Sequence, residues 1–508
     1  MNAAKHDLTP VLVAIFILIG AAILWYWSKL SSSLPPGPVH LPIVGYLPFL
    51  GPNLLTHFTN MAHSYGPIFK IWLGSKLHIV INTPELARTV VRDQDETFAN
   101  RSITIAASII TYGGQDIAWS NNNSSWRNLR KILVHEVLSN KNREACSSFR
   151  RDEVRKTIKN VYSKMGTEIC IKEISFSMIT NVLTRMVWGK NSHLGVELQM
   201  VVLKIVEMLG KPNLSDFFPF LIWFDLQGVE RETKRHFKNL DRVFTSIIDD
   251  RIKLNSEGLD VAVGHEGKKD LLQILLELKD QKDATSLDIT KIKALLTDIM
   301  VAGTETTTSV IEWAMTEIMQ NPNVMKRVQE ELAEIVGPNN IVEESHLSKL
   351  KYLDATVKET LRLHPIVPLL VPRSPSQTCT VGGYTIPKGC TVFVNVWAIH
   401  RDPRYWDNPL EFNPERFLTC DGMDKLYDFK GNNLKFFPFG SGRRICPGVP
   451  LVEKMQIYIL ASLLHSFDWS LPKGEEHDFS DMFSLALKKT KPLIAIPSQR
   501  LPDVSLYM

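Results

Sequence analysis

The sequence predicts an α+β fold that is mostly α-helical and carries small β-sheets. Two observations predict this fold class. Helical periodicity dominates residues 125–365, whereas strand-like alternation is confined to residues 39–95, to residues 366–400 and to a short stretch after the last predicted helix. The 508 residues and the hydrophobic content of 44% are ample for a large core.

An uncharged apolar run lies near the N-terminus. Residues 8–27 are enough for a helix to cross a hydrocarbon core of about 30 Å. The aromatic residues 25–27 end the run and Lys29 follows, as is typical of a membrane interface. We therefore expect a membrane anchor at residues 1–30. A cleaved signal peptide is the alternative, although its apolar region would be shorter.

Proline-rich chain separates this run from the remainder. SSSLPPGP at residues 31–38 predicts a stiff, solvated segment. We expect a linker at residues 31–52 and one globular domain at residues 53–508, in which residues 68–82 form a β-hairpin around a Gly-Ser turn.

Charge and cysteine content exclude several functions. The net charge of +4 is modest and no nucleic-acid-binding motif is present, so we expect no nucleic-acid partner. Six cysteines in so long a chain, without a C-x-x-C pair, indicate neither a disulfide framework nor a zinc site.

Residues 288–320 predict one long helix of roughly 50 Å, since they contain no proline and Pro322 follows them. Within it, AGTETT at residues 302–307 places three hydroxyls and an acid beside Gly303. A threonine-rich helix face is the simple interpretation. The functional interpretation is a helix that opens locally, because threonine hydroxyls can bond the carbonyl one turn back and bend the helix.

Three further motifs carry little meaning alone. Glu359 and Arg362 are three residues apart, and such a pair on a helix surface contributes only about 0.2–0.5 kcal/mol. Arg416 lies in the proline-bounded segment NPERF, and Trp126 and Arg130 are four residues apart in WRNLR. Each has a structural interpretation that needs no function.

The stretch FGSGRRICPG at residues 439–448 places one cysteine among glycines and arginines. In chain order, W-x3-R, A-G-x-E-T-T, E-x-x-R, P-E-R-F and F-x-x-G-x-R-x-C-x-G resemble the cytochrome P-450 family of haem-thiolate monooxygenases. The resemblance covers essentially the whole chain from Leu34 onward, and the anchor with PPGP resembles the microsomal members. Residues 53–508 would then form the catalytic domain.

The resemblance implies heme b as cofactor, with the Cys446 thiolate as axial iron ligand. Pro447 has no N–H group, so backbone donors to the sulfur must be Gly448, Val449 or later residues. The further cofactor contacts that the family implies are Trp126, Arg130, Arg373 and Arg444 for the propionates, with Phe439, Gly448, Ala302 and Gly303 around the macrocycle.

The family also implies the catalytic and structural residues. Thr306 and Glu305 would deliver protons during dioxygen activation, a general-acid role. Glu359, Arg362 and Arg416 would form a structural triad behind the haem. Because the sequence has no flavin- or NAD-binding motif, electrons would come from NADPH through a separate flavin-containing NADPH-cytochrome P-450 reductase, with O2 and a small hydrophobic substrate as reactants.

Finer motifs resemble plant specialised-metabolism members. GKPNLSDFFP, WFDLQGVE and YDFKGNNLKFFPFGSG resemble a branch that includes δ-cadinene hydroxylase and other sesquiterpene oxidases. This implies hydroxylation of a sesquiterpene or related terpenoid, with onward oxidation to a ketone as an extension. A flavone or flavonoid hydroxylase is the alternative, and a haem-thiolate isomerase or dehydratase is a distant one. We expect a single-pass endoplasmic-reticulum membrane protein, in contact with membrane lipid, whose catalytic domain is cytosolic.

Overall fold

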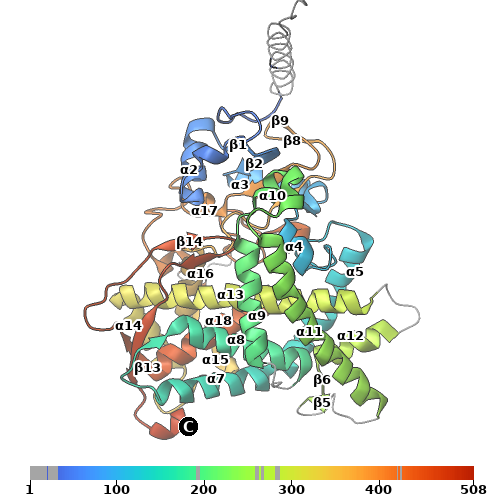
Figure 1. Cartoon of the computed structure of the whole chain (residues 1–508). Coiled ribbons are helices and arrows are strands. Elements are labelled where there is room, and N and C mark those ends of the chain that lie inside the picture. The colour runs from blue at the N-terminus through green and yellow to red at the C-terminus, as the bar shows by residue number, and fades with distance from the viewer. Residues whose placement is uncertain are drawn as a thin grey trace, which may run out of the picture.

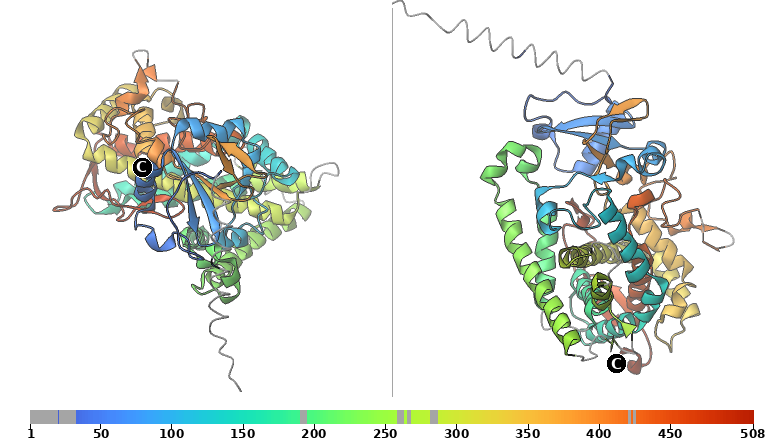
Figure 2. Two further views of the ribbon diagram at one scale, coloured as in Figure 1. Left: turned by 90° about the horizontal axis from the view of Figure 1, so that it is seen from above. Right: turned by 90° about the vertical axis from the view of Figure 1, so that its right-hand side faces the viewer.

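The computed structural model describes residue 20 and residues 33–189, 195–257, 263–264, 268–280, 287–419, 422–423 and 426–508. Most of these residues are helical, and the helices form one large body with a smaller sheet-containing part at one end (Figure 1 and Figure 2). The predicted α+β class with small sheets is confirmed.

The α-helices are α2 (Leu54–Tyr65), α3 (Pro84–Arg88), α4 (Ile105–Ile110), α5 (Ser124–Ile132), α6 (Asn140–Ala145), α7 (Ser147–Tyr162), α8 (Ile171–Trp188), α9 (Gly195–Gly210), α10 (Leu214–Phe217), α11 (Val229–Ser256), α12 (Leu271–Asp280), α13 (Ile289–Gln320), α14 (Pro322–Ile335), α15 (Glu344–Leu347), α16 (Lys351–Leu363), α17 (Val396–Ile399) and α18 (Val449–Ser466). The strands are β1 (Ile68–Leu73), β2 (Lys76–Ile81), β3 (Asn100–Arg101), β4 (Ile169–Cys170), β5 (Val263–Gly264), β6 (Lys268–Lys269), β7 (Arg373–Ser374), β8 (Cys379–Val381), β9 (Tyr384–Ile386), β10 (Thr391–Val394), β11 (Leu418–Thr419), β12 (Gly422–Met423), β13 (Phe467–Ser470), β14 (Asp481–Phe483), β15 (Leu487–Lys489) and β16 (Ile494–Gln499).

The largest sheet joins chain segments that are far apart in the sequence. Its strand order is β1-β2-β10-β7-β3. The predicted hairpin of residues 68–82 is confirmed, because β1 and β2 pair antiparallel with Ile68 opposite Ile81. β10 then pairs parallel with β2 and antiparallel with β7. The sheet therefore fixes Arg373, on β7, against the early part of the chain.

Helix α13 crosses the middle of the helical body (Figure 1). It begins after Asp288, whose carboxylate accepts the Lys291 N–H at 2.8 Å, and ends before Pro322, as predicted. The expected local opening at residues 302–307 is wrong for this structure, since α13 is an uninterrupted α-helix. The hydroxyls of Thr304, Thr306 and Thr307 do donate to carbonyls one turn back, but these bonds are added to the backbone hydrogen bonds of the helix and do not replace them.

Gly303 lies where α13 packs on α8. A methyl group placed on it would lie 2.9 Å from the Cδ1 atom of Leu183, which is closer than a normal contact. Glycine at this position therefore permits the close approach of the two helices in addition to lining the cavity described below.

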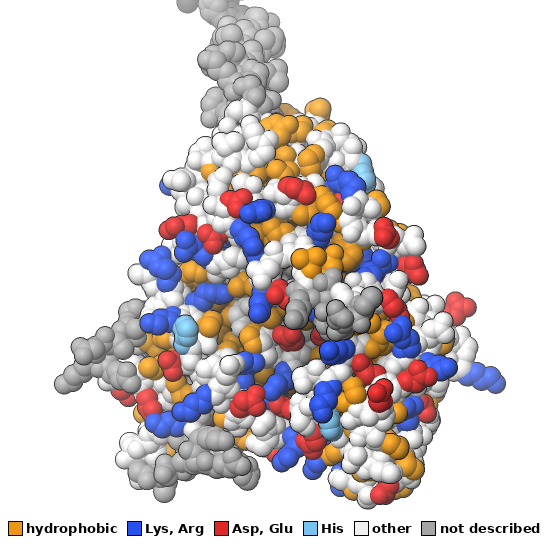
Figure 3. All heavy atoms as spheres, turned by 180° about the vertical axis from the view of Figure 1, so that it is seen from behind, with side chains coloured by type: hydrophobic (Ala, Val, Ile, Leu, Met, Phe, Trp, Pro, Cys, Tyr) orange, Lys and Arg blue, Asp and Glu red, His pale blue; other side chains and the backbone are white. Residues whose placement is uncertain are grey.

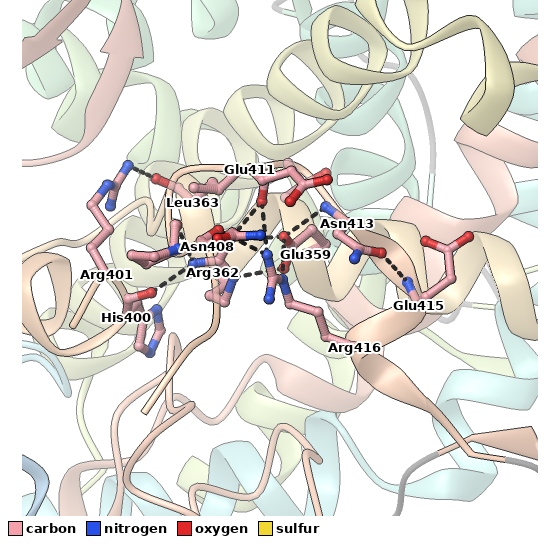
Figure 4. A network of polar contacts seen from close by, with 12 residues as sticks. Glu359, Arg362, Leu363, His400, Arg401, Asn408, Glu411, Asn413, Glu415 and Arg416 are labelled. Atoms are coloured by element: carbon pink, nitrogen blue, oxygen red, sulfur yellow. Dashed lines mark hydrogen bonds and ion pairs between the residues drawn. The ribbon is translucent and has the colours of Figure 1, made fainter. Parts of the chain in front are cut away.

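Behind α13, Glu359 and Arg362 on α16 form a fully buried ion pair (Figure 4). The guanidinium of Arg362 donates to both carboxylate oxygens of Glu359, at 2.6 and 2.8 Å. Arg416 donates to Glu359 at 3.1 Å. The remaining donors of Arg362 bind the backbone carbonyls of His400, at 2.8 Å, and Pro409, at 2.7 Å. This is a buried network and not the surface pair that the spacing alone allows.

His400 carries this network to the cysteine-containing segment. Its Nε2 atom accepts a hydrogen bond from the backbone N–H of Phe437 at 3.1 Å, which requires the neutral ring. Burial, followed by repulsion from Arg362, lowers the pKa of His400 to about 3, so the ring stays neutral. Glu359 is thus connected through two side chains to the start of the segment that holds Cys446.

Within the part of the chain that the structure describes, no helix is long and apolar enough to cross a membrane. The expected anchor, with its transmembrane helix at about residues 8–27, lies outside the described residues apart from residue 20.

Substituting Glu359→Gln should destabilise the fold strongly, because Arg362 and Arg416 lose their buried counter-charge. We expect the free energy of unfolding, measured by denaturant titration, to fall by about 3–5 kcal/mol. The matched control is Glu207→Gln, since Glu207 forms an exposed pair with Lys204, also three residues away, at 3.0 Å. There we expect a loss below about 0.5 kcal/mol. Equal losses would contradict a structural role for the buried pair.

Candidate active site

The segment that holds Cys446 is shaped by glycines. Gly440 and Gly442 have φ angles of +76° and +68°, which L-residues with side chains rarely adopt. A Cβ atom on Gly442 would also overlap the carbonyl oxygen of Val91. The segment is pinned as well by the N–H of Cys446, which donates to the carbonyl of Phe439 at 3.0 Å. The two glycines therefore fix where the cysteine lies.

The Cys446 sulfur lies at the N-terminal end of α18. The backbone N–H groups of Gly448 and Val449 donate to it, which confirms the two donors predicted from the absence of an N–H on Pro447. Burial raises the pKa of the Cys446 thiol, while these two N–H groups and the Arg130 guanidinium oppose the increase. The site thus supplies donors for a thiolate but needs a further cation to hold the charge fully.

A cavity of about 300 Å³ opens above this sulfur. The predicted cofactor residues Ala302, Gly303, Phe439 and Gly448 line it, together with Thr306. The other walls are mostly apolar and come from α8, α13, α16, α18, residues 133–138 and the segment after α16. Representative lining residues are Leu133, Ile179, Val182, Leu183, Val310, Leu361, Ile366, Val367, Leu370, Val371 and Met455.

Four arginines lie along one side of the cavity: Arg101, Arg130, Arg373 and Arg444. Burial lowers the pKa of Arg373 to about 10. Burial, with repulsion from Arg373 and Arg130, lowers that of Arg444 to about 9. The Nε and Nη1 atoms of Arg373 are buried and have no hydrogen-bond partner among the described residues. This side of the cavity therefore carries excess positive charge with unused donors.

Trp126 supports this cluster from behind. The guanidinium carbon of Arg444 lies 4.0 Å from its ring centroid, and that of Arg130 lies 5.8 Å away. Its indole N–H donates to the carbonyl of Ile117 at 3.0 Å. In this structure Trp126 therefore stacks under the guanidinium groups, while its own N–H is used by the protein backbone.

Thr306 and Glu305 face different surroundings. The Thr306 hydroxyl lies in the cavity and donates to the carbonyl of Ala302 at 2.6 Å. Glu305 is buried away from the described cavity lining, where it forms ion pairs with Lys488 at 2.8 Å and Lys172 at 3.4 Å. The structure brings Thr306 to the site and holds the Glu305 carboxylate outside it.

A thiol that faces a cavity bordered by a cluster of guanidinium groups, with unused donors on Arg373, is the arrangement that an iron porphyrin with a thiolate ligand requires, so the site defines a haem-thiolate protein. The chain belongs to one such family: a profile described as "Cytochrome P450" matches residues 35–496. It is therefore a cytochrome P-450 monooxygenase, and a haem iron with a thiolate ligand is its cofactor.

Similar proteins include plant enzymes across nearly the full length. "Cytochrome P450 76C1" of Arabidopsis thaliana is 39% identical over 94% of each chain. Flavonoid 3',5'-hydroxylase of Solanum melongena is 36% identical over 97% of this chain and 96% of its own. Geraniol 8-hydroxylase of Catharanthus roseus is 36% identical over 97% and 99%. A solved zebra fish cytochrome P450 with abiraterone has a TM-score of 0.73 and 26% identity, and covers 88% of this chain and 100% of its own.

The residues present fit a haem. Two propionate carboxylates would supply the negative charge that the arginine cluster lacks, and the orphaned donors of Arg373 are suited to a carboxylate. The apolar walls fit a flat macrocycle, and Cys446 faces the same space. The residues that would hold the group are thus Cys446, Arg130, Arg373 and Arg444, which the family resemblance implies, together with Arg101.

The sequence analysis did not single out every residue that the structure brings to the site. Arg101 stands alone before the apolar run SITIAASII, with no partner motif to draw attention to it. Asp298 also lines the cavity. A signal for it was present, because Asp298, Ala302 and Thr306 follow at intervals of four and share one helix face.

We expect Gly442→Ala to prevent correct placement of Cys446, because the new Cβ overlaps the Val91 carbonyl in a backbone conformation that already disfavours alanine. The measurement is haem bound per chain and the thiolate-type spectrum of the reduced carbon monoxide complex; we expect most of both to be lost. The control is Gly383→Ala, which also has positive φ, at +85°, but has open space around it. Full haem content in both variants would show that the close approach is unimportant.

Proposed function

We propose that this plant-type hydroxylase acts on a sesquiterpene or related terpenoid, with onward oxidation to a ketone as an extension. The observation that carries the proposal is the mostly apolar lining of the cavity above Cys446. Such a lining gives little support for binding a sugar or a highly charged acid and favours a hydrocarbon-like ligand. One of the similar plant enzymes, geraniol 8-hydroxylase, also carries a terpenoid in its name.

In this proposal the bound haem supplies oxidising chemistry, with O2 as oxidant and electrons from NADPH through a separate reductase. The chain's own residues hold and isolate the reaction. Cys446 supplies the thiolate, which its neighbouring N–H groups and Arg130 stabilise. The apolar walls exclude water and orient the substrate. Thr306 offers a hydroxyl that can pass a proton at its Oγ1 atom.

Glu305 is proposed as the second proton-handling residue. Its ion pairs with Lys172 and Lys488 hold the carboxylate outside the cavity, so this role requires the side chain to leave both lysines. A glutamate held by two cations is also a structural element at the contact of α13 with α8 and β15. Substituting Thr306→Ala therefore tests the role of the hydroxyl without changing Glu305 or its ion pairs.

A flavone or flavonoid hydroxylase is the second candidate. It is favoured by relatives named flavonoid 3',5'-hydroxylase, which are as similar as the geraniol enzyme at 36% identity. A haem-thiolate isomerase or dehydratase is a more distant candidate. It would use neither NADPH nor O2, so dependence on NADPH distinguishes it from a hydroxylase.

We also propose that the protein sits on the endoplasmic-reticulum membrane with its catalytic domain in the cytosol. Large apolar side chains are exposed at the end of the molecule that holds β1, β2 and α10 (Figure 1 and Figure 3). The turn between β1 and β2 contacts α10 at this end, because the Ser75 hydroxyl donates to the Phe217 carbonyl at 2.8 Å. The exposed residues are Val39, Leu41, Ile43, Phe49, Leu214, Phe220, Ile222, Trp223, Phe224 and Leu226. Such a patch is suited to lipid contact.

The first test is to co-express the chain with a plant reductase and supply NADPH with sesquiterpene hydrocarbons, sesquiterpene alcohols and flavones. We expect products heavier by one oxygen from a sesquiterpene, absent without NADPH and absent from Cys446→Ala. Oxygenated flavone alone would favour the second candidate. A product formed without NADPH would favour the isomerase or dehydratase.

We expect Thr306→Ala to lower the yield of product per NADPH consumed by about 10-fold or more, because a positioned proton donor contributes about 10²–10⁴-fold to rate. Product and NADPH oxidation are measured together. The matched control is Thr304→Ala: Thr304 also donates to the carbonyl one turn back, at 2.8 Å, but is fully buried outside the cavity lining. A similar loss in both variants would argue for a general effect on α13.

Membrane orientation can be read from the sequon at Asn123. This residue is exposed, so a lumenal domain would offer it for glycosylation, whereas a cytosolic domain would not. We expect no change in gel mobility when membranes from plant cells are treated with an endoglycosidase. A mobility change that Asn123→Gln abolishes would contradict the cytosolic orientation. The sequon at Asn213 is a poorer reporter because that residue is buried.

A further inference from the structure

Asp298 is the one carboxyl group among the described residues that line the cavity. It lies on α13, eight residues before Thr306. Eight residues correspond to a rise of about 12 Å and to slightly more than two turns, so both side chains face the same space from opposite ends. Asp298 is partly accessible and belongs to the lining of the cavity.

A second carboxyl group, that of Asp116, lies directly behind Asp298. Asp116 is fully buried and accepts the backbone N–H groups of Trp119 and Ser120, both at 3.0 Å. The two carboxyl groups are hydrogen-bonded to each other. Two carboxylates cannot share a hydrogen bond unless one carries a proton. The pair therefore holds one proton between them.

The proton belongs on Asp298. Burial, and then the neighbouring Asp116, raises the pKa of Asp298 well above its ordinary value. Burial also raises the pKa of Asp116, but the N–H groups of Trp119 and Ser120 oppose this increase, and the guanidinium groups of Arg101 and Arg444 favour its charged form. Asp298 thus presents a neutral carboxylic acid to the cavity, so this residue adds no charge that would oppose the entry of an apolar ligand.

The hydrogen bonds of Asp298 leave one position of its carboxyl group unused. Its Oδ2 atom accepts the Ile117 N–H at 2.6 Å, the Ala118 N–H also donates to the carboxyl group, and its proton binds Asp116. A carboxyl group offers about four such positions. The position that remains is a lone pair, so it is an acceptor.

We infer that the cavity-facing oxygen of Asp298 accepts a hydrogen bond from a hydroxyl group of the substrate. This inference rests on the proposed function and narrows its substrate class to an apolar skeleton that already carries a hydroxyl. Because Asp298 and Thr306 are about 12 Å apart along α13, the new oxygen enters at the end of the substrate remote from that hydroxyl. Asp298 is a positioning residue, whereas Thr306 acts at the reacting end.

A purely structural role for the pair accounts for less. Holding residues 116–120 against α13 explains the bonds to Ile117 and Trp119. It does not require an acid at the cavity surface, because an asparagine at position 298 could accept the Ile117 N–H and donate to Asp116 equally well. The two interpretations therefore differ in what the cavity-facing atom does, and this difference can be measured.

Asp298→Asn preserves the contacts with Ile117 and Asp116 but turns an N–H toward the cavity in place of a lone pair. The probes are farnesol, its methyl ether and farnesene, with a hydroxyflavone, its methyl ether and flavone as a second set. Affinity is measured by the change in the haem absorption spectrum on titration of the haem-loaded full chain, so that turnover is not needed.

In the wild-type protein we expect the alcohol or phenol of at least one set to bind about 10-fold more tightly than its methyl ether, as one hydrogen bond allows. In Asp298→Asn we expect this preference to vanish or reverse, with hydrocarbon affinity unchanged within about 2-fold. The control is Thr297→Val, whose hydroxyl donates within α13 at 2.9 Å and lies outside the described cavity lining. It should retain the wild-type preference.

Equal affinity for alcohol and ether in the wild-type protein, or no spectral response to either set, would overturn the inference. So would a preference that persists in Asp298→Asn. A normal spectrum of the reduced carbon monoxide complex establishes that each variant is folded. This test can fail independently of the proposed function. A preference for the hydroxyl compound without any oxygenated product would contradict the proposed hydroxylase function but support the hydrogen bond to Asp298. Hydroxylation of farnesene, with farnesene bound as tightly as farnesol, would support the hydroxylase function but contradict the hydrogen bond to Asp298.

Discussion

The buried ion pair between Glu359 and Arg362 is the constraint on which much of the structure depends. Neither side chain is exposed, so each charge must be matched within the protein. Arg362 meets this need partly through Glu359 and partly through backbone carbonyls, including that of His400. The neutral ring of His400 then accepts the Phe437 N–H, just before the glycines that place Cys446. Satisfying two buried charges thus helps to position the thiol.

The cavity above Cys446 is electrostatically one-sided. Arginines occupy one edge, with unused donors on Arg373, while α8 and α18 contribute apolar walls. An anionic, flat cofactor resolves both properties together: its carboxylates meet the arginines and its macrocycle meets the apolar walls. What then remains for substrate is bounded by α13, where hydrogen-bonding groups are few. The polar side chains that α13 contributes to the described lining are the acid at position 298 and the hydroxyls at positions 306 and 307.

The sequence predicted features that follow from local chemistry. It predicted the end of α13 from Pro322 and the donors to Cys446 from the missing N–H of Pro447, and the structure agrees. It did not predict the burial of Glu359 and Arg362, because a spacing of three residues is the same on a surface helix and on a core helix. Tertiary packing, which no local pattern encodes, decides between these.

Glu305 and Thr306, which are adjacent in the AGTETT motif, show a second limit of prediction from sequence. Successive residues of a helix are rotated by about 100°, so Thr306 faces the cavity while Glu305 faces Lys172 and Lys488. The helical period predicts that the side chains of Glu305 and Thr306 point in different directions. It does not predict the ion pairs of Glu305, because these depend on Lys172 of α8 and Lys488 of β15. The threonine-rich sequence is compatible with an opened or a continuous helix; in this structure the hydroxyls bind carbonyls of α13 and the helix is continuous.

The arginines of the buried network recognise the main chain and not the side chains of the segment that they hold. Arg362 and Arg416 donate to the carbonyls of Pro409, Asn408 and Glu411, which every amino acid would present. The side chains of this segment are consequently not needed for these hydrogen bonds. During evolution its outward surface can diverge, to suit a new partner or environment, while the support of the cysteine beneath it is inherited intact.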